Sequence, residues 1–208
     1  MIDPGQGVAL TKQSPVISMT KGRGAGGQMR VNLKWHQGGG KHRLFGLGGP
    51  SEDKIDLDLA AMWELTDGTK GVVQALGNHF GSIDRAPYIQ LDADDRTGQS
   101  AGGENLTINL DHIDKIARVL IFAYIYAGAA SFGDADGVVT LYPVGAPPVE
   151  VRLGADGGKS KSCGVAMLIP DLSGGLTVRR EVKYVPGFHD ELDAAFRWGM
   201  TYTKTTKD

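Results

Sequence analysis

The chain has little cysteine, no long apolar run and almost no net charge, and each shortage excludes a class of protein. Cys163 is the only cysteine, so neither an intrachain disulfide nor a cluster of thiolate metal ligands can form. The longest apolar stretch, residues 119–130, is shorter than the ~20 residues that a membrane-spanning helix needs. A formal net charge of -2 gives no electrostatic argument for nucleic acid or anionic lipid as a partner.

Recognisable catalytic groupings are also scarce, so we do not expect an enzyme. No two histidines have the i, i+4 spacing of a zinc pair; the five are His36, His42, His79, His112 and His189. Cys163 has no neighbouring base, and a buried core cysteine is the expected role. Neither glycine-rich loop, at residues 21–27 and 38–43, leads a Gly-Lys-Ser/Thr sequence into a helix. These loops are predicted to be connections with basic contact groups.

The sequence does contain many short segments with the period-two alternation of β-strands. Residues 29–35 place apolar side chains on one face and Arg30, Asn32 and Lys34 on the other, as in a half-buried strand. Residues 117–126 are expected to form a central strand that is covered on both faces. Further strands are expected at residues 55–59, 71–75, 88–91, 106–110, 138–142, 149–153, 165–169 and 176–185.

Turn residues separate these segments, with 31 glycines and nine prolines in the chain. The predicted fold class is therefore all-β, an antiparallel β-sandwich of two sheets with short helical segments and one C-terminal helix. That helix is indicated by Phe188, Leu192 and Phe196, which recur at i, i+4 and i+8. No internal repeat or domain boundary is evident, so residues 1–208 are expected to form a single domain, with a frayed tail from Thr201.

A central acidic segment is the strongest functional signal. Its oxygen-bearing side chains surround a glycine-rich turn: Asp92, Asp94, Asp95, Thr97, Glu104 and Asn105. Short oxygen donors without histidine or cysteine are what a hard divalent cation prefers, and calcium accepts six to eight such oxygens in loose geometry. The competing interpretation is a solvated acidic turn, because Asp, Gly and Asn are ordinary turn residues.

Two further pairs of aspartates have the same two interpretations, as metal ligands or as ordinary polar residues. Asp56 and Asp58 lie on one face of a predicted strand, either as metal ligands or as an ordinary solvent-facing surface. Asp134 and Asp136 form a second Asp-x-Asp-Gly turn, for which a hairpin loop is the favoured interpretation.

At this point the residues resemble the TerD-type domain of tellurium-resistance and stress proteins. Residues 10–15, Leu-Thr-Lys-Gln-Ser-Pro, are similar to its early Leu-Thr-Lys-x-x-Pro, and residues 31–35 resemble its Val-x-Leu-x-Trp strand. Residues 55–60 resemble its Asp-Leu-Asp-Ala segment, and residues 92–105 its acidic signature. Later, Ile-Asp-Lys-Ile at 113–116 and Ser-Phe-Gly at 131–133 fit its Val-Asp-Lys-Ile and Asn-Phe-Gly, and the long C-terminal tail resembles the TerA branch.

The resemblance implies a calcium-binding β-sandwich without established catalytic activity. It implies a role in resistance to tellurite and chemical stress, together with other such proteins in cytoplasmic or membrane-associated complexes. The metal ligands that it implies are Asp56, Asp58, Asp92, Asp94, Asp95, Thr97, Gly98, Glu104 and Asn105.

The chain departs from the family's acidic signature. Ala101 and Gly103 stand where the family has aspartates, while Glu104 and Asn105 keep oxygen donors with less charge. Fewer anionic ligands weaken calcium binding, so we expect reduced affinity, one remaining site, or none.

Three hypotheses follow. The first is a cytoplasmic calcium-dependent stress or tellurium-resistance module that binds protein partners, in solution or at the inner face of the membrane. The second is a non-catalytic scaffold of the same fold with a degenerate metal site. The third, least favoured, is a divalent-metal enzyme acting on phosphate-containing substrates.

Overall fold

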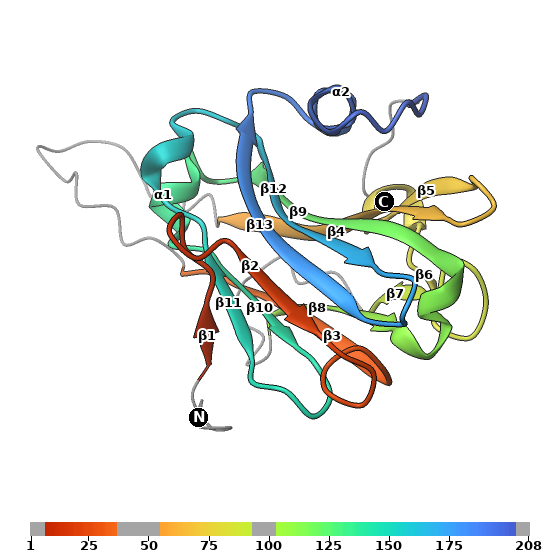
Figure 1. The fold of residues 1–208 in the computed structure, drawn as a ribbon. Helices are drawn as coiled ribbons and strands as arrows, with labels where there is room; N and C mark the ends of the chain where they lie inside the picture. The colour runs from red at the N-terminus through yellow and green to blue at the C-terminus, as the bar shows by residue number, and fades with distance from the viewer. Residues whose placement is uncertain (1–6, 37–54, 93–102, 203–208) are drawn as a thin grey trace, which may run out of the picture.

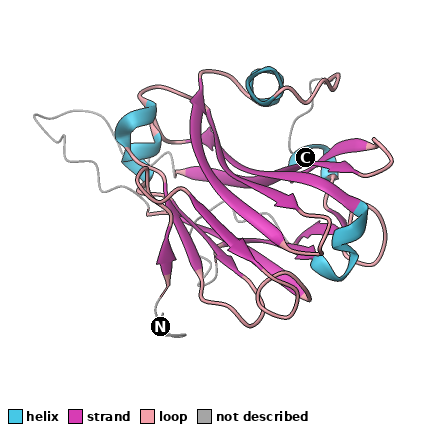
Figure 2. Ribbon diagram, viewed as in Figure 1, coloured by secondary structure: helices cyan, strands magenta, loops and turns pink. Residues whose placement is uncertain are grey.

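Two β-sheets packed face to face form the body of the protein (Figures 1 and 2). This computed structural model describes residues 7–36, 55–92 and 103–202. The predicted all-β sandwich, with short helical segments and one C-terminal helix, is confirmed.

The first sheet has seven strands. In spatial order they are β1 (Val8–Ala9), β11 (Val149–Arg152), β10 (Val138–Tyr142), β3 (Gln28–Lys34), β8 (Glu104–Asn109), β7 (Ile89–Leu91) and β6 (Gly81–Ser82). Every pairing in this sheet is antiparallel except one: β1 runs parallel to β11, with Val8 opposite Val149. This two-residue pairing is the one departure from the predicted antiparallel arrangement among the described strands.

The second sheet has six strands. In spatial order they are β2 (Val16–Met19), β13 (Leu176–Val185), β12 (Ser162–Pro170), β9 (Ile116–Ala127), β4 (Asp56–Leu65) and β5 (Lys70–Val73). The segment predicted as a central strand is β9, which pairs with β12 on one side and β4 on the other. The helices are α1 (Phe132–Ala135), α2 (His189–Phe196) and three 3-10 turns at Leu76–Asn78, Leu110–Lys115 and Ala155–Gly157.

The main core lies between the sheets, and its composition follows from strand alternation. In β4, for example, Leu57, Leu59 and Ala61 face inward and are buried. The intervening Ala60 and Met62 face outward, into a second apolar cluster. Strand β4 is therefore buried on both faces, although one of these faces lies outside the sandwich.

Helix α2 and the chain after it cover that outward face, as the ribbon in Figure 1 shows. Leu192 and Trp198 are buried there, and the Arg118 guanidinium of β9 lies 3.9 Å from the Trp198 ring centroid. Leu192 was predicted correctly, but Phe188 is the N-cap residue and is 42% exposed. The expected frayed tail was also too early, because the Tyr202 hydroxyl donates to Asp193 Oδ2 at 3.1 Å.

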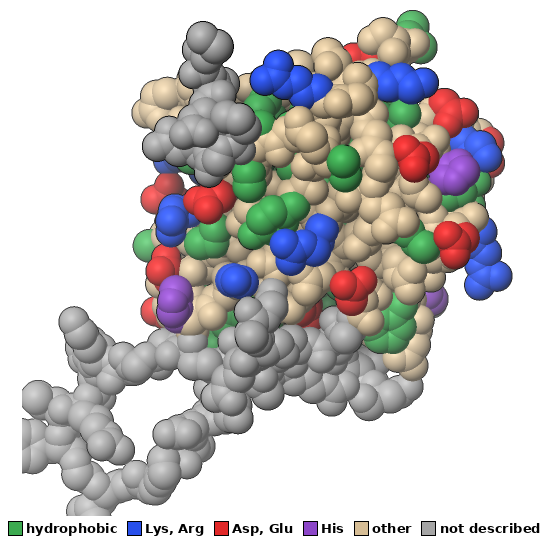
Figure 3. Space-filling view, turned by 90° about the horizontal axis from the view of Figure 1, so that it is seen from below, with side chains coloured by type: hydrophobic (Ala, Val, Ile, Leu, Met, Phe, Trp, Pro, Cys, Tyr) green, Lys and Arg blue, Asp and Glu red, His purple; other side chains and the backbone are tan. Residues whose placement is uncertain are grey.

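No helix among the described residues is both long and apolar enough to cross a membrane. On the face seen in Figure 3, positive and negative side chains are interspersed with apolar ones and form no broad patch of one sign.

Candidate metal-binding edge

Strand β4 has an edge that its neighbour β5 covers only in part. Strand β5 pairs with Ala61 to Glu64, so the first half of β4 extends beyond it. The Leu59 backbone N–H points to this uncovered side and donates to Glu104 Oε2 at 2.6 Å. A side chain from the other sheet thus satisfies a backbone donor that lies beyond the end of β5. Asp56, Asp58 and Glu104 are hereafter called the acidic edge.

All three carboxylates of the acidic edge are buried. The exposed fractions are 5% for Asp56, 0% for Asp58 and 1% for Glu104. Asp58 lies opposite Tyr124 on β9, which is itself fully buried. The interpretation of Asp56 and Asp58 as a solvated polar face is therefore wrong. Burial of a carboxylate is costly unless hydrogen bonds, a cation or protonation compensate it.

Asn105 is held by two donors of strand β3. Its side-chain oxygen accepts from Asn32 Nδ2 at 3.0 Å and from an Arg30 guanidinium nitrogen at 3.1 Å. An amide oxygen has two lone pairs, so in this conformation none remains for a metal ion. The nearby Arg30 charge also opposes a cation. Asn105 therefore joins strands β3 and β8, a role that the sequence did not indicate.

Gly103 has a backbone that an aspartate would not tolerate. Its φ is +64°, and a Cβ atom added there would lie 2.2 Å from the Leu33 carbonyl oxygen. Both the left-handed conformation and this contact oppose any L side chain. The absence of an aspartate at this position therefore goes together with the backbone conformation in which β8 begins beside Leu33.

The predicted ligands are only partly brought together. Asp92 is exposed, and its backbone N–H donates to the Asn105 carbonyl at 2.9 Å, which continues the β7–β8 hairpin by one residue. Asp94, Asp95, Thr97 and Gly98 lie outside the described residues. Within the described ranges, no three Asp, Glu, His or Cys side chains converge as a metal site. Alternation explains this, since Asp58 points to the outer face while Glu104 reaches β4 from the other sheet.

The second aspartate pair does not form the expected hairpin loop. It lies at helix α1, where Asp134 Oδ2 accepts from the Ser131 N–H and hydroxyl, each at 2.9 Å. This is a capping box. Asp136 ends the helix with a φ of 45°.

The groups considered for nucleophilic chemistry have structural roles here. Cys163 is buried, which raises the pKa of its thiol well above the usual range, and the predicted core role is confirmed. Burial also lowers the pKa of His189 to about 4, and its ring packs against Phe122 and Tyr124. Both groups are therefore uncharged at neutral pH.

One motif was missed in the sequence. Residues 98–102, Gly-Gln-Ser-Ala-Gly, match the Gly-x-Ser-x-Gly pattern of hydrolase nucleophiles. That motif works at a turn from a strand into a helix. Residues 98–102 lie outside the described ranges, and the next described element is strand β8, which starts at Glu104, rather than the helix that the motif requires.

Solved structures share this two-sheet fold. The chain aligns with the crystal structure of a homologue of the telluride resistance protein TerD, SCO6318 from Streptomyces coelicolor A3(2). The TM-score is 0.54 at 25% identity, over 77% of this chain and 91% of that one. The unknown-function protein SAV2460 shares the fold, with a TM-score of 0.58 at 22% identity over 85% and 99% of the two chains.

The sequence comparison is closer. Over 200 residues the chain is 44% identical to the tellurium resistance protein TerA of an Alcaligenes species, which covers 96% of this chain. The chain spans 58% of that relative's length. No protein-family model matches. The resemblance predicted from the motifs is nonetheless confirmed: the chain is related to tellurium-resistance proteins of the TerD type, and this relative is a TerA.

Proposed function

We propose that the protein is a calcium-binding module of tellurium resistance and stress response, which acts by metal-dependent binding of protein partners rather than by catalysis. The observation that carries the proposal is the acidic edge, where three carboxylates are withdrawn from solvent. The described residues on both sides of the 93–102 segment lie close to this edge or pair with each other. Asp92 pairs with Asn105, and Glu104 contacts the Leu59 N–H of β4.

Calcium suits this donor set because it accepts carboxylate and hydroxyl oxygens in flexible numbers. Asp56 and Asp58 of β4 would contribute oxygens, and Asp94, Asp95 and Thr97 would supply the others. Glu104 accepts from the Leu59 N–H and, among the described residues, does not converge with the two aspartates on one ion. Asn105 is withdrawn from the ligand set, because Arg30 and Asn32 occupy its oxygen. When bound, the cation would neutralise the buried carboxylates and order the acidic segment as a surface for a partner.

Titration of calcium into chelator-stripped protein tests the site. With calcium 100-fold above its Kd, native-state binding adds about 2.7 kcal/mol, or a rise in Tm of about 5–10 °C for a domain of this size. Asp58→Asn and Asp94→Ala should abolish the rise. Asp190→Asn, which removes an exposed carboxylate from α2, should keep it. An equal rise in wild type and Asp58→Asn would place the ligands elsewhere.

A scaffold with a degenerate metal site is the second candidate, and two observations favour it. Gly103 stands where the family has an aspartate, and the Asn105 oxygen is occupied by protein donors. This candidate predicts no calcium-dependent change in Tm and the same partners with calcium or chelator.

Partner binding is tested by affinity capture from cytoplasmic and membrane fractions of the native cells. We expect other tellurium-resistance or stress proteins to be retained with calcium and lost with chelator or with Asp58→Asn. If the same proteins are captured with chelator and with Asp58→Asn, the scaffold is supported instead. Growth on tellurite with and without the gene tests the resistance role separately.

A further inference from the structure

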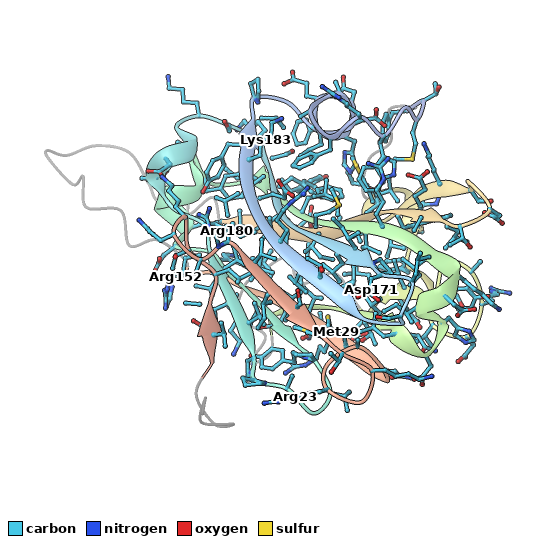
Figure 4. The ribbon with its side chains drawn as sticks, in the orientation of Figure 1. Arg23, Met29, Arg152, Asp171, Arg180 and Lys183 are labelled. Atoms are coloured by element: carbon cyan, nitrogen blue, oxygen red, sulfur yellow. The ribbon has the colours of Figure 1, made fainter. Side chains whose placement is uncertain are left out.

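A second feature lies at the opposite side of the sandwich, between the free edges of the two sheets. A pocket with a volume of about 220 Å³ opens there. Strand β1 and the residues after it provide Leu10 and Lys12, strand β11 provides Glu150 and Arg152, and strand β13 provides Arg180. Figure 4 labels Arg152 and Arg180, which approach the opening from different sheets. We call this the basic pocket.

Arg180 points inward although it is charged. Leu176 and Val178, four and two residues earlier on β13, face the core between the sheets, and strand alternation directs Arg180 the same way. Its side chain is partly buried. Within the described part of the chain, its guanidinium has no hydrogen bond or ion pair with protein. The preceding Arg179 faces outward and is paired with Glu181 at 2.6 Å.

The other cations of the pocket are held only loosely. Lys12 pairs with Asp156 at 2.9 Å, with 70% and 69% of the two side chains exposed. Arg152 lies 4.0 Å from Glu150, the one carboxylate among the residues that line the pocket. Exposed pairs of this kind are weak, so both cations are free to turn toward an incoming anion.

A partly desolvated guanidinium without a protein acceptor is costly, and an anion with two oxygens can compensate it through parallel hydrogen bonds. The pocket is smaller than the roughly 300 Å³ at which pockets for drug-sized ligands begin. We propose that the basic pocket binds a small free oxyanion of the phosphate or sulfate class, with Arg180 as its bidentate partner. Arg152 and Lys12 attract the anion at the mouth, and Glu150 limits its affinity.

Titration with sodium phosphate tests the proposal, with chloride replaced so that ionic strength stays constant. The Nε–H resonance of Arg180 should shift and saturate in a proton–nitrogen correlation spectrum. Arg180→Gln should weaken phosphate binding about ten-fold or more. The matched control, Arg179→Gln on the opposite face of the same strand, should change it by less than about two-fold. Sulfate should compete with phosphate.

Several results would overturn the proposal. They are an Arg180 resonance that does not respond, a shift that never saturates, or equal losses in Arg180→Gln and Arg179→Gln. Should Arg180→Gln fail to fold, Arg180→Lys keeps the charge but not the fork of donors, and it should give an intermediate loss. Calcium and Asp58→Asn should leave phosphate binding unchanged, because β9 and β12 separate β4 from β13.

Discussion

The two open sides of the sandwich carry charges of opposite sign, and they differ in how deeply the charged side chains are buried. At the acidic edge the carboxylates are at most 5% exposed. At the basic pocket, Lys12 and Arg152 expose 70% and 71% of their side chains. Water screens the cations at almost no cost, whereas buried carboxylates must be compensated within the fold.

This difference shows where mutations should act on stability and where they should act on binding alone. Glu104 connects the two sheets through the Leu59 N–H, so the acidic edge is part of the folded framework. In the basic pocket, no described residue depends on the Arg180 side chain for a hydrogen bond. Changes at the acidic edge should therefore lower the free energy of unfolding, and those at the pocket mouth should not.

The largest effect is expected when a carboxylate is added to the acidic edge. Gly103→Asp combines a left-handed backbone with a contact to the Leu33 carbonyl, and should lower the free energy of unfolding by about 4 kcal/mol. Urea denaturation measures this. Gly68→Asp is the matched control, because Gly68 has a φ of +85° but open space around it; about 1 kcal/mol is expected there. Equal losses would show that the contact with Leu33 is unimportant.

Removal of a carboxylate from the acidic edge should cost less. Glu104→Ala leaves the buried Leu59 N–H without its acceptor, and we expect a loss of about 2–3 kcal/mol in chelator-treated protein. Glu104→Gln keeps an acceptor oxygen and should lose less. A stabilised Glu104→Ala would mean that charge repulsion, rather than the hydrogen bond, dominates this edge and would reverse the comparison.

His189 makes the stability of the protein depend on pH. Burial lowers the pKa of His189 from 6.5 to about 4, so the unfolded chain binds the additional proton between these values. The contribution of His189 to the free energy of unfolding is therefore fully present above pH 6.5 and is lost as the pH drops toward 4. Because the ring is partly exposed, the loss is on the order of 2 kcal/mol.

His189→Phe should remove this part of the pH dependence in urea denaturation curves. Any loss of stability that remains between pH 6.5 and 4 then belongs to other groups. An unchanged pH profile would exclude His189 as the titrating group.

The smallest effect is expected at the mouth of the basic pocket. Lys12→Ala breaks a pair in which both partners are mostly exposed, and the melting temperature should not change measurably. Phosphate affinity should decrease, by less than in Arg180→Gln. A large loss of stability would contradict the view that this side of the sandwich is a binding surface only.

Much of the fold could be predicted because strand periodicity is local. Residues 138–142 and 176–185 were predicted with the bounds that β10 and β13 have. Strands β1, β2 and β6 were missed, and each is two to four residues long. Segments that short become strands only through a partner, as β1 does beside β11.

The candidate site was predictable to a lesser extent. Alternation placed Asp56 and Asp58 on one strand face, but nothing local indicated that this outer face would be buried. The role of Asn105 depends on Arg30 and Asn32, some 75 and 73 residues away. Arg180 could have been noticed, because it continues the inward phase of Leu176 and Val178.

The sequence by itself determined the longer strands, their inward faces and the acidic composition of the central segment, because each depends on residues a few positions apart. Only the tertiary structure decided that Glu104 meets Leu59 across 45 residues, and that β13 places Arg180 beside the β1–β11 edge. Such contacts arise when two sheets pack, and packing depends on the whole chain.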